Sequence, residues 1–413
     1  MPNEPATMPP KLPLDRNRDF KVLLTSQTVS ALGDAVSFTA LPLLVLALTG
    51  SGFAMGVVGA FQTLPDLVFG MLAGAFADRS DCKRMMFLAD FGRALLTALI
   101  PLSVAVEGPT MAVILVVAAP MSILRSFFLA GYTASIPALV GRGQVGRANS
   151  IFEALYSLGF IVGPAIAGIL AATIGPGPTL AIDAVSFGIS AVALAALRTD
   201  LRAPVDRVQP PILSAIREGI DYVIASPELR SIIPIWTIVA VLIAPLVTAL
   251  AVRVTRDLGQ PSSTLGALLA TYGVGTVIGS LVSARIINYV RPGIVLLTGN
   301  IIVGSALVVV ALESYVPVLF GAALVAGAAQ SMTLVTYITL RTAYSPDEFL
   351  GRIGSTARTI SIGLQPIGLL IGGALIDRIG GSTTMALMGV TIALVSLCFV
   401  PVRAIRSATL HPR

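Results

Sequence analysis

Residues 20–50, FKVLLTSQTVSALGDAVSFTALPLLVLALTG, form a long apolar run with one acidic residue, Asp34, near its middle. A helix needs about 20 mostly apolar residues to cross the hydrocarbon core of a bilayer. We therefore predict a first membrane span near residues 21–48. Residues 1–20 are polar and proline-rich and do not resemble a cleavable signal peptide, so we expect this span to be retained.

Comparable apolar runs follow along the whole chain. Only 12% of the 413 residues are charged, 55% are hydrophobic and the mean hydropathy is +0.90. A soluble protein of this length needs a more polar surface, so the bilayer is the main solvent. We predict an all-α membrane protein with 12 transmembrane helices, near residues 21–48, 54–77, 85–106, 110–135, 151–174, 177–197, 230–252, 263–288, 292–313, 315–341, 355–377 and 380–403.

The predicted spans divide into two bundles of six. We expect an N-terminal tail (1–20), a first bundle (21–197), a linker (198–229) in which 212–225 forms a surface helix, a second bundle (230–403) and a C-terminal tail (404–413). A shift of 205 residues superposes Gly163 on Gly368 and Gly168 on Gly373. The two halves therefore look like parallel repeats, as in transporters whose bundles rock about a midplane site.

The basic residues predict the orientation. Most Lys and Arg residues lie in alternate loops and in both tails, which places both termini in the cytoplasm, although Arg253, Arg256 and Arg378 fall on the other side. We expect a multi-pass protein of the bacterial cytoplasmic (inner) membrane. The net charge of +6 then reports orientation, and we expect no nucleic-acid partner.

Composition also bears on chemistry. Cys82 and Cys398 are far apart in sequence, and the single histidine, His411, lies in the tail, so neither a zinc site nor a histidine-based hydrolytic triad can be assembled. The chain has no nucleotide-binding Gly-Lys-Ser/Thr loop. We expect no metal, no cofactor and no enzymatic activity. The expected partners are a small-molecule substrate, protons and the lipid bilayer, with the protein a monomer.

Asp34 is the first candidate for a functional charge. A charge at mid-span costs about 2.5–3.5 kcal/mol on insertion scales. Gln27, Ser30, Asp34 and Ser37 recur at helical spacing and form a polar stripe that should face a cavity. The balance between burial and a nearby cation decides whether such a carboxyl group binds a proton. The alternative is an Asp held permanently by hydrogen bonds between helices.

Two further residues complete the predicted proton-coupling set of Asp34, Asp66 and Arg125. Asp66 follows Pro65 in the second span, where the Pro-Asp pair is alternatively a local cap in a kinked helix. Arg125 in the fourth span is the predicted cationic partner of these acids, because a guanidinium biases a neighbouring carboxylate without releasing its own proton. A structural salt bridge is the alternative for Arg125.

A wider set of polar and aromatic residues is predicted to line the substrate cavity, with ordinary helix packing as the alternative for each aromatic residue. Glu153 and Arg358 begin the fifth and eleventh spans as gate or interfacial charges, and Asp183 is expected to cap the sixth span. The cavity set is Gln27, Ser30, Gln62, Glu153, Trp236, Tyr272, Gln330, Tyr337 and Arg358.

Residues 74–84, GAFADRSDCKR, resemble the signature loop of the major facilitator superfamily. The resemblance implies a gating loop whose Asp and basic residues latch the cytoplasmic side in one state. Asp81 and Cys82 depart from the usual Gly and Arg. Positive-inside charge alone is the alternative for the basic residues. The predicted gating set is Gly74, Asp78, Arg79, Lys83, Arg84, Asp90 and Arg93.

In the fifth span, residues 159–168, GFIVGPAIAG, resemble the antiporter motif of exporters within this superfamily. Glycines four residues apart allow helices to approach closely, and Pro164 favours a kink. Packing alone is the alternative, and Ala167 stands where the motif commonly has a further glycine. The predicted motif residues are Gly159, Gly163, Pro164 and Gly168.

The resemblance extends over nearly the whole chain. Gly33 and Asp34 followed by ALPLLVLALTGS, the segment with Asp90 and Arg93, and PALVGRGQVGRANS resemble the branch that includes macrolide-efflux pumps and the enterobactin exporter. This implies export of drugs or secondary metabolites by proton antiport, with Arg125 at the position of the fourth-span arginine. The alternatives are a dedicated siderophore or metabolite exporter, an importer or facilitator of the same fold, an intramembrane enzyme and a membrane sensor.

Overall fold

The computed structural model describes residues 13–409 except 78, 109, 200, 202–211, 288, 347–349 and 407, and these residues form helices without any β-strand. The first half contains α1 (Arg18–Thr49), α2 (Gly52–Ala77), α3 (Cys82–Ala105), α4 (Thr110–Val140), the 3₁₀ turn η1 (Arg142–Gln144), α5 (Val145–Thr173), α6 (Pro176–Thr179) and α7 (Ala181–Ala195). The second half contains α8 (Ile212–Ala225), α9 (Pro227–Ile243), α10 (Leu246–Val252), the π-helix η2 (Arg253–Asp257), α11 (Ser262–Ile286), α12 (Pro292–Leu312), α13 (Val316–Ala343), α14 (Leu350–Gly363), α15 (Gln365–Phe399) and α16 (Arg403–Arg406).

Eleven helical segments in the described part of the chain are long and apolar enough to cross a membrane. The last of them, Thr356–Phe399, has 44 residues, and a straight helix of that length would measure about 66 Å, twice the thickness of the hydrocarbon core. Gly380 breaks it with φ 82° and ψ 165°, a conformation that favours glycine. The segment therefore crosses, turns and returns, which gives the predicted twelve crossings.

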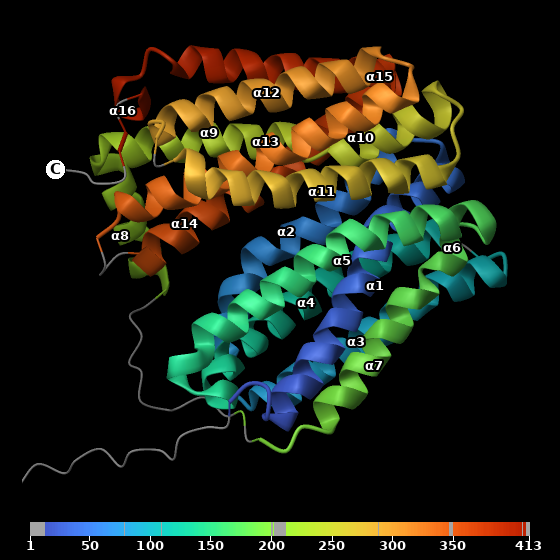
Figure 1. Ribbon diagram of the computed structural model, residues 1–413. Coiled ribbons are helices and arrows are strands. Elements are labelled where there is room, and N and C mark those ends of the chain that lie inside the picture. Colours follow the sequence, from blue (N-terminus) through green and yellow to red (C-terminus); the bar gives the residue numbers. More distant parts are fainter. Residues whose placement is uncertain are drawn as a thin grey trace, which may run out of the picture.

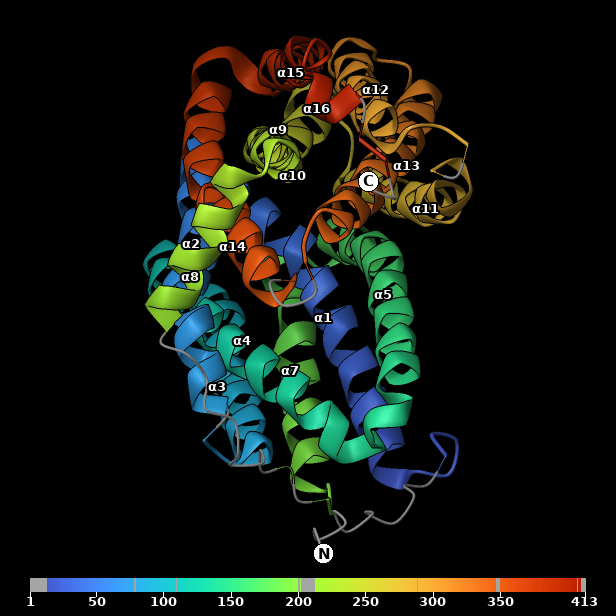
Figure 2. The same ribbon diagram turned by 90° about the vertical axis from the view of Figure 1, so that its left-hand side faces the viewer.

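The helices form two bundles, α1–α7 and α9–α15, which lie on either side of a central plane (Figure 1). Figure 2 looks onto the end at which α1 begins and at which α8 and α16 lie, and we call this the terminal end. The turns between α1 and α2, between η2 and α11, and at Gly380 lie at the opposite end. α8 occupies the residues predicted to form the surface helix, whereas linker residues 202–211 lie outside the described part.

The 205-residue repeat reappears as equivalent helix contacts. On α5, Gly163 approaches Ala35 of α1 so closely that a side chain at position 163 has no room. On α15, Gly368 approaches Val241 of α9 in the same way. The shift that superposes Gly163 on Gly368 also carries Ala35 onto Ala240, next to Val241. The same pair of helices is therefore packed through glycine in both halves.

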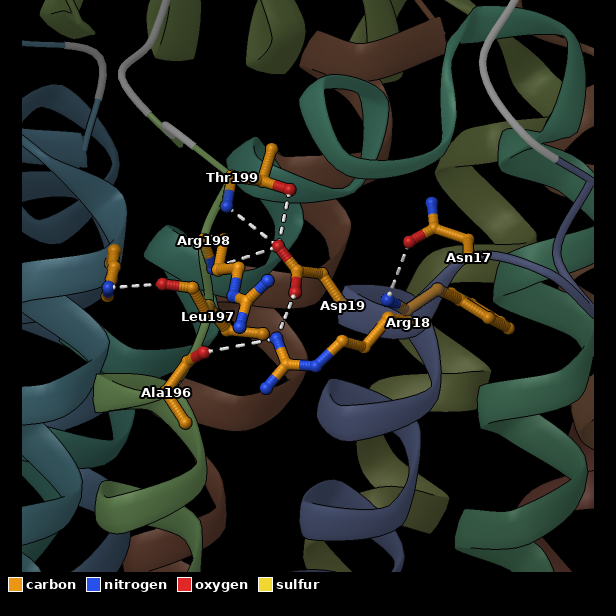
Figure 3. Close-up of polar contacts among 9 residues, drawn as sticks. Asn17, Arg18, Asp19, Ala196, Leu197, Arg198 and Thr199 are labelled. Carbon is orange, nitrogen blue, oxygen red and sulfur yellow. Dashed lines mark hydrogen bonds and ion pairs between the residues drawn. The ribbon is translucent and has the colours of Figure 1, made fainter.

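At the terminal end, the carboxylate of Asp19 joins the first helix of the N-terminal bundle to its last (Figure 3). The buried Asp19 accepts hydrogen bonds from the backbone nitrogens of Arg198 and Thr199, at 2.9 and 2.7 Å, and from Thr199 Oγ1 at 2.6 Å. Lys83 Nζ on α3 donates to the carbonyl oxygen of Leu197 at 2.5 Å. These bonds satisfy backbone groups at the end of α7 and close the bundle.

We predict that Asp19→Asn lowers the unfolding temperature of the detergent-solubilised protein by several degrees. The amide offers a single acceptor oxygen, and each lost hydrogen bond to a charged group costs about 1.5–3 kcal/mol. Asp15→Asn is the matched control, because Asp15 is an exposed acid one turn earlier in the chain. Equal unfolding temperatures for the two variants in a thermal-shift measurement would show that the Asp19 contacts do not stabilise the bundle.

Candidate functional site

An ion pair between α1 and α3 lies at the middle of the N-terminal bundle. Arg93 Nη2 donates to Asp34 Oδ1 at 2.8 Å, and Arg93 Nη1 donates to Asp90 Oδ1 at 3.2 Å. The side chains of Arg93 and Asp90 are 4% and 0% exposed, whereas that of Asp34 is 36% exposed. A buried guanidinium is tolerated when it is paired with counter-charges. The three side chains therefore form one buried unit with an accessible edge at Asp34.

A third carboxyl group, on α7, borders this unit. The guanidinium carbon of Arg93 lies 3.8 Å from the ring centroid of Phe187, in a cation–π contact. Asp183 is 2% exposed and accepts a hydrogen bond from Ser186 Oγ at 3.3 Å. A side-chain carbon at Gly33 would lie only 2.8 Å from Asp183 Oδ1. α1, α3 and α7 thus meet at three carboxyl groups and one guanidinium.

Three consecutive residues of α1 face three different helices. Gly33 packs on α7, Asp34 pairs with α3, and Ala35 packs against Gly163 of α5. Successive residues of an α-helix point about 100° apart, so three positions cover more than half of its circumference. α1 is therefore the central helix of the site, and Gly33 is required where its backbone meets α7.

The structure gives Asp34 a partner that the sequence analysis had grouped with the gating loop. Asp34 forms a salt bridge with Arg93 of α3, whereas the pairing of Arg125 with Asp66 stays a prediction, because the side chain of Asp66 lies outside the described part of the structure. Arg125 is exposed. Its charge acts on Tyr156 of α5, and the charges of Asp34 and Glu153 act on the same tyrosine. Both arginines lie within predicted spans, so the sequence alone does not show which of them contacts Asp34. The packing of α3 against α1 places Arg93 there.

Two other predicted positions also change. Asp90 and Arg93 were grouped with the gating loop, but they lie in the interior of α3, away from its first turn. Asp183 was expected to cap a helix, yet α7 begins after Leu180 without a side-chain cap, and Asp183 faces the bundle interior. Asp183, Ser186 and Ser190 recur at helical spacing in an apolar helix, and this polar stripe is the signal that sequence reasoning missed.

The polar stripe predicted on α1 faces α7 for part of its length. Gln27 Nε2 donates to Ser190 Oγ at 3.2 Å, and Ser30 is buried. Gln62 on α2 and Glu153 on α5 are both exposed. The side chain of Asp66 lies outside the described part of the structure.

In the C-terminal bundle, the predicted cavity residues lie in different settings. Trp236 and Tyr337 stack with ring centroids 4.6 Å apart and planes 9° from parallel, and Tyr337 is buried. Tyr272 lines a small apolar cavity with aliphatic side chains of the same bundle. Gln330 is half-buried, and Arg358 is exposed at the terminal end. Packing, the alternative held open for the aromatic residues, describes Tyr337, which is buried and stacked on Trp236.

The loop between α2 and α3 owes one of its departures from the superfamily pattern to helix capping. The carboxylate of Asp81 accepts hydrogen bonds from the backbone nitrogens of Lys83 and Arg84, at 2.9 and 3.3 Å, as an N-cap of α3. Arg79 and Arg84 are exposed, and Gly74 has open space around it. Asp78 lies outside the described residues.

The glycines of the predicted antiporter motif lie on two faces of α5. Gly159 and Gly163 pack against α1 in the same bundle. Gly168 packs across the central plane, where a side-chain carbon would lie 2.7 Å from the carbonyl oxygen of Ser262 and 2.8 Å from Cα of Gly266, both on α11. Ser262 Oγ also donates to the carbonyl oxygen of Gly168 at 3.3 Å. α5 therefore connects α1 to the second bundle.

Two repeated six-helix bundles are an architecture of secondary transporters, whose substrate and ion sites lie near the bilayer midplane. Residues 10–413 match the family described as transmembrane secretion effector. The chain therefore belongs to this family, within the drug and metabolite exporter branch of the major facilitator superfamily, as the sequence resemblance predicted. It is a membrane transporter and not an enzyme.

Individual relatives are consistent with this assignment. The chain is 29% identical over 387 residues to the multidrug efflux pump Tap of Mycolicibacterium fortuitum, covering 92% of this chain and 94% of the relative. It is 25% identical over 401 residues to macrolide efflux protein A of Streptococcus pyogenes, covering 95% and 97%. The crystal structure of the nucleoside transporter NupG superposes with a TM-score of 0.76 at 12% identity, over 93% and 99% of the two chains, which shows a shared fold.

We predict that Gly33→Ala separates α1 from α7 and lowers both the unfolding temperature and transport. The added carbon would approach Asp183 Oδ1 and Ser186 Cβ to 2.8 Å, and a packed interior has little room to relax. Gly188→Ala on α7 is the control, because the space around Gly188 is open and alanine favours a helix. If Gly33→Ala retains the unfolding temperature of the Gly188→Ala variant, the close contact between α1 and α7 is not required.

Proposed function

We propose that this protein exports small amphipathic molecules, drugs or secondary metabolites, in exchange for protons and by alternating access. The names of its relatives, a multidrug efflux pump and a macrolide efflux protein, support the substrate class. The observation that carries proton exchange is the Asp34–Arg93 ion pair, which is buried on the arginine side and exposed on the aspartate side. A proton carrier needs both a paired charge and a path to water.

The proposed proton site is defined by its charges. Asp34, Asp90 and Asp183 lie around the guanidinium of Arg93, so the fully ionised cluster has three negative charges and one positive charge. Uncompensated charge away from water is costly, and a bound proton removes one such charge. Asp34 is the entry point in this proposal, because its side chain is the one with substantial exposure.

Helix contacts offer a route from the proton to the substrate path. A proton on Asp34 would neutralise the partner of Arg93 and loosen α1 from α3. α1 packs through Ala31 and Ala35 against Gly159 and Gly163 of α5. α5 in turn contacts α11 of the other bundle, so a shift of α1 is transmitted in our proposal to the surface between the halves.

The energetics are adequate for export. One proton that crosses a potential of about 100 mV supplies roughly 2.3 kcal/mol, before any pH gradient is counted. About 1.4 kcal/mol corresponds to a tenfold concentration ratio. One proton for each substrate molecule would therefore sustain more than tenfold accumulation.

We infer that the terminal end faces the cytoplasm of a bacterium and that the protein lies in the inner membrane. The basic residues of the loop between α2 and α3, Arg79, Lys83 and Arg84, lie at that end. Such residues are retained on the cytoplasmic side of spans. Substrate would then enter from the cytoplasm or the inner leaflet and leave at the opposite end.

In proteoliposomes, we predict that an imposed pH gradient drives accumulation of a radiolabelled macrolide by the wild type and by Asp15→Asn, and not by Asp34→Asn. Asp34→Asn should still exchange labelled for unlabelled macrolide when no gradient is applied, because exchange needs no net proton movement. Accumulation by Asp34→Asn at the wild-type rate would contradict the assignment of Asp34. A wild type that transports macrolide but ignores the pH gradient would be a facilitator.

In bacteria that lack their own efflux pumps, we predict that expression of the wild type raises resistance to several amphipathic antibiotics. Bacteria that express Asp34→Asn at the same level should lose most of this resistance, because uphill export requires proton exchange. The measurement is a panel of minimal inhibitory concentrations. Resistance to no compound in the panel would instead favour a dedicated siderophore or metabolite exporter.

A further inference from the structure

At the end opposite to the termini, an acidic residue of the second bundle binds the beginning of a helix in the first. The carboxylate of Asp377, on α15, accepts hydrogen bonds from Ser51 Oγ at 2.6 Å, from the backbone nitrogen of Gly52 at 2.5 Å and from that of Phe53 at 3.1 Å. Gly52 and Phe53 are the first two residues of α2. One carboxylate thus joins the two halves through three donors.

These donors belong to a helix terminus that needs an acceptor. The first four N–H groups of an α-helix have no partner within the helix, and the N-terminus favours a negative charge. Ser51 Oγ accepts from the nitrogen of Ala54 at 3.1 Å and so satisfies one of these groups. Asp377 satisfies two more of these N–H groups. This role usually belongs to the N-cap residue directly before the helix, whereas Asp377 lies in the opposite bundle.

The backbones below this cap are in close contact. Gly52 and Gly56 of α2 leave no room for side chains against Ile376 and against the carbonyl oxygen of Leu369. Gly373 is equally confined by Gly52 and Phe53, where a side-chain carbon would lie 3.0 Å from Cα of Phe53. Asp377 comes directly after Ile376 on α15, next to this close contact. Its carboxylate therefore reaches the beginning of α2 only while the two bundles are in contact at this end.

Another carboxylate at this end binds the turn that follows Asp377. Asp257, at the end of η2, accepts from the backbone nitrogen and Oγ of Ser382 at 3.0 and 2.5 Å. Ser382 follows Gly380, where α15 reverses direction. This contact lies entirely within the second bundle and does not join the halves.

We propose that Asp377 is a latch between the two halves, which caps α2 from the other bundle and must release before the end opposite to the termini can open. Asp377, Ser51 and Phe53 are exposed or partly exposed, so water can replace the carboxylate when the contact breaks. Exposed charged contacts contribute modestly to stability. The latch therefore favours the closed state without making it permanent. The inference rests on the alternating access in the proposed function and not on its proton chemistry.

The test measures the distance across this end with two spin labels. The labels are placed at Val106, which follows α3 in the first bundle, and at Tyr315, which precedes α13 in the second. Both side chains are exposed, at 68% and 65%. Cys82 is buried and Cys398 exposed, so Val106→Cys and Tyr315→Cys are made in a Cys398→Ser background. Asp377→Asn should increase the population at long distance by a few-fold, in line with the modest energy of an exposed charged contact.

Asp257→Asn is the matched control, because it removes an equivalent carboxylate at the same end without touching the contact between halves, and it should leave the distances unchanged. Ser51→Ala should shift the population in the same direction as Asp377→Asn but less. In the double variant of Ser51→Ala and Asp377→Asn, the Ser51→Ala change should not increase the long-distance population further, because the carboxylate that Ser51 binds is already lost. Ser51→Ala alone also tests the latch if Asp377→Asn does not fold.

An unchanged distance distribution in both Asp377→Asn and Ser51→Ala would overturn the latch, as would an equal shift in Asp257→Asn. These outcomes are separate from those of the transport assays. A protein that ignores the pH gradient but opens in Asp377→Asn supports the latch and contradicts proton exchange. A protein that follows the gradient and does not respond to Asp377→Asn retains the proposed function without the latch.

Discussion

The ion pair of Asp34 and Arg93 is the constraint on which the N-terminal bundle is built. A guanidinium that is 4% exposed in the membrane interior must be matched by carboxylates and covered by apolar or aromatic groups. α3 supplies Asp90, α7 supplies the ring of Phe187, and α1 supplies Asp34. Each helix is thereby fixed in rotation, because turning any one of them would leave a buried charge without its partner.

This requirement explains why the two halves share packing but not charge. The repeat superposes Asp34 on Val239, which is fully buried in the second bundle. Gly163 and Gly368 keep the same close helix contact in both halves, since that contact depends only on backbone shape. The buried Arg253 of the second bundle donates to the backbone carbonyl oxygens of Val310 and Glu313.

The sequence predicted the elements better than it predicted their contacts. Apolar runs and turns identify the spans, because each span must satisfy its own backbone hydrogen bonds in lipid. Asp34 is identified for a different reason, because an unpaired charge within a span is costly in lipid. The choice of Arg93 over Arg125 required the order of helices around α1, which periodicity does not contain. Asp377 was missed because its donors lie more than 320 residues away in sequence.

The contacts within the first bundle and those between the halves differ in how easily water can replace them. Inside the first bundle the charges of Arg93 and Asp90 are buried, so breaking their contacts exposes charge to a low-dielectric interior. Between the halves, the contacts are glycine backbones and an exposed carboxylate on the end of a helix, whose polar groups water can satisfy. Under the alternating access that we propose, the buried contacts of Arg93 and Asp90 would keep the first bundle intact, while the contacts between the bundles would break and re-form.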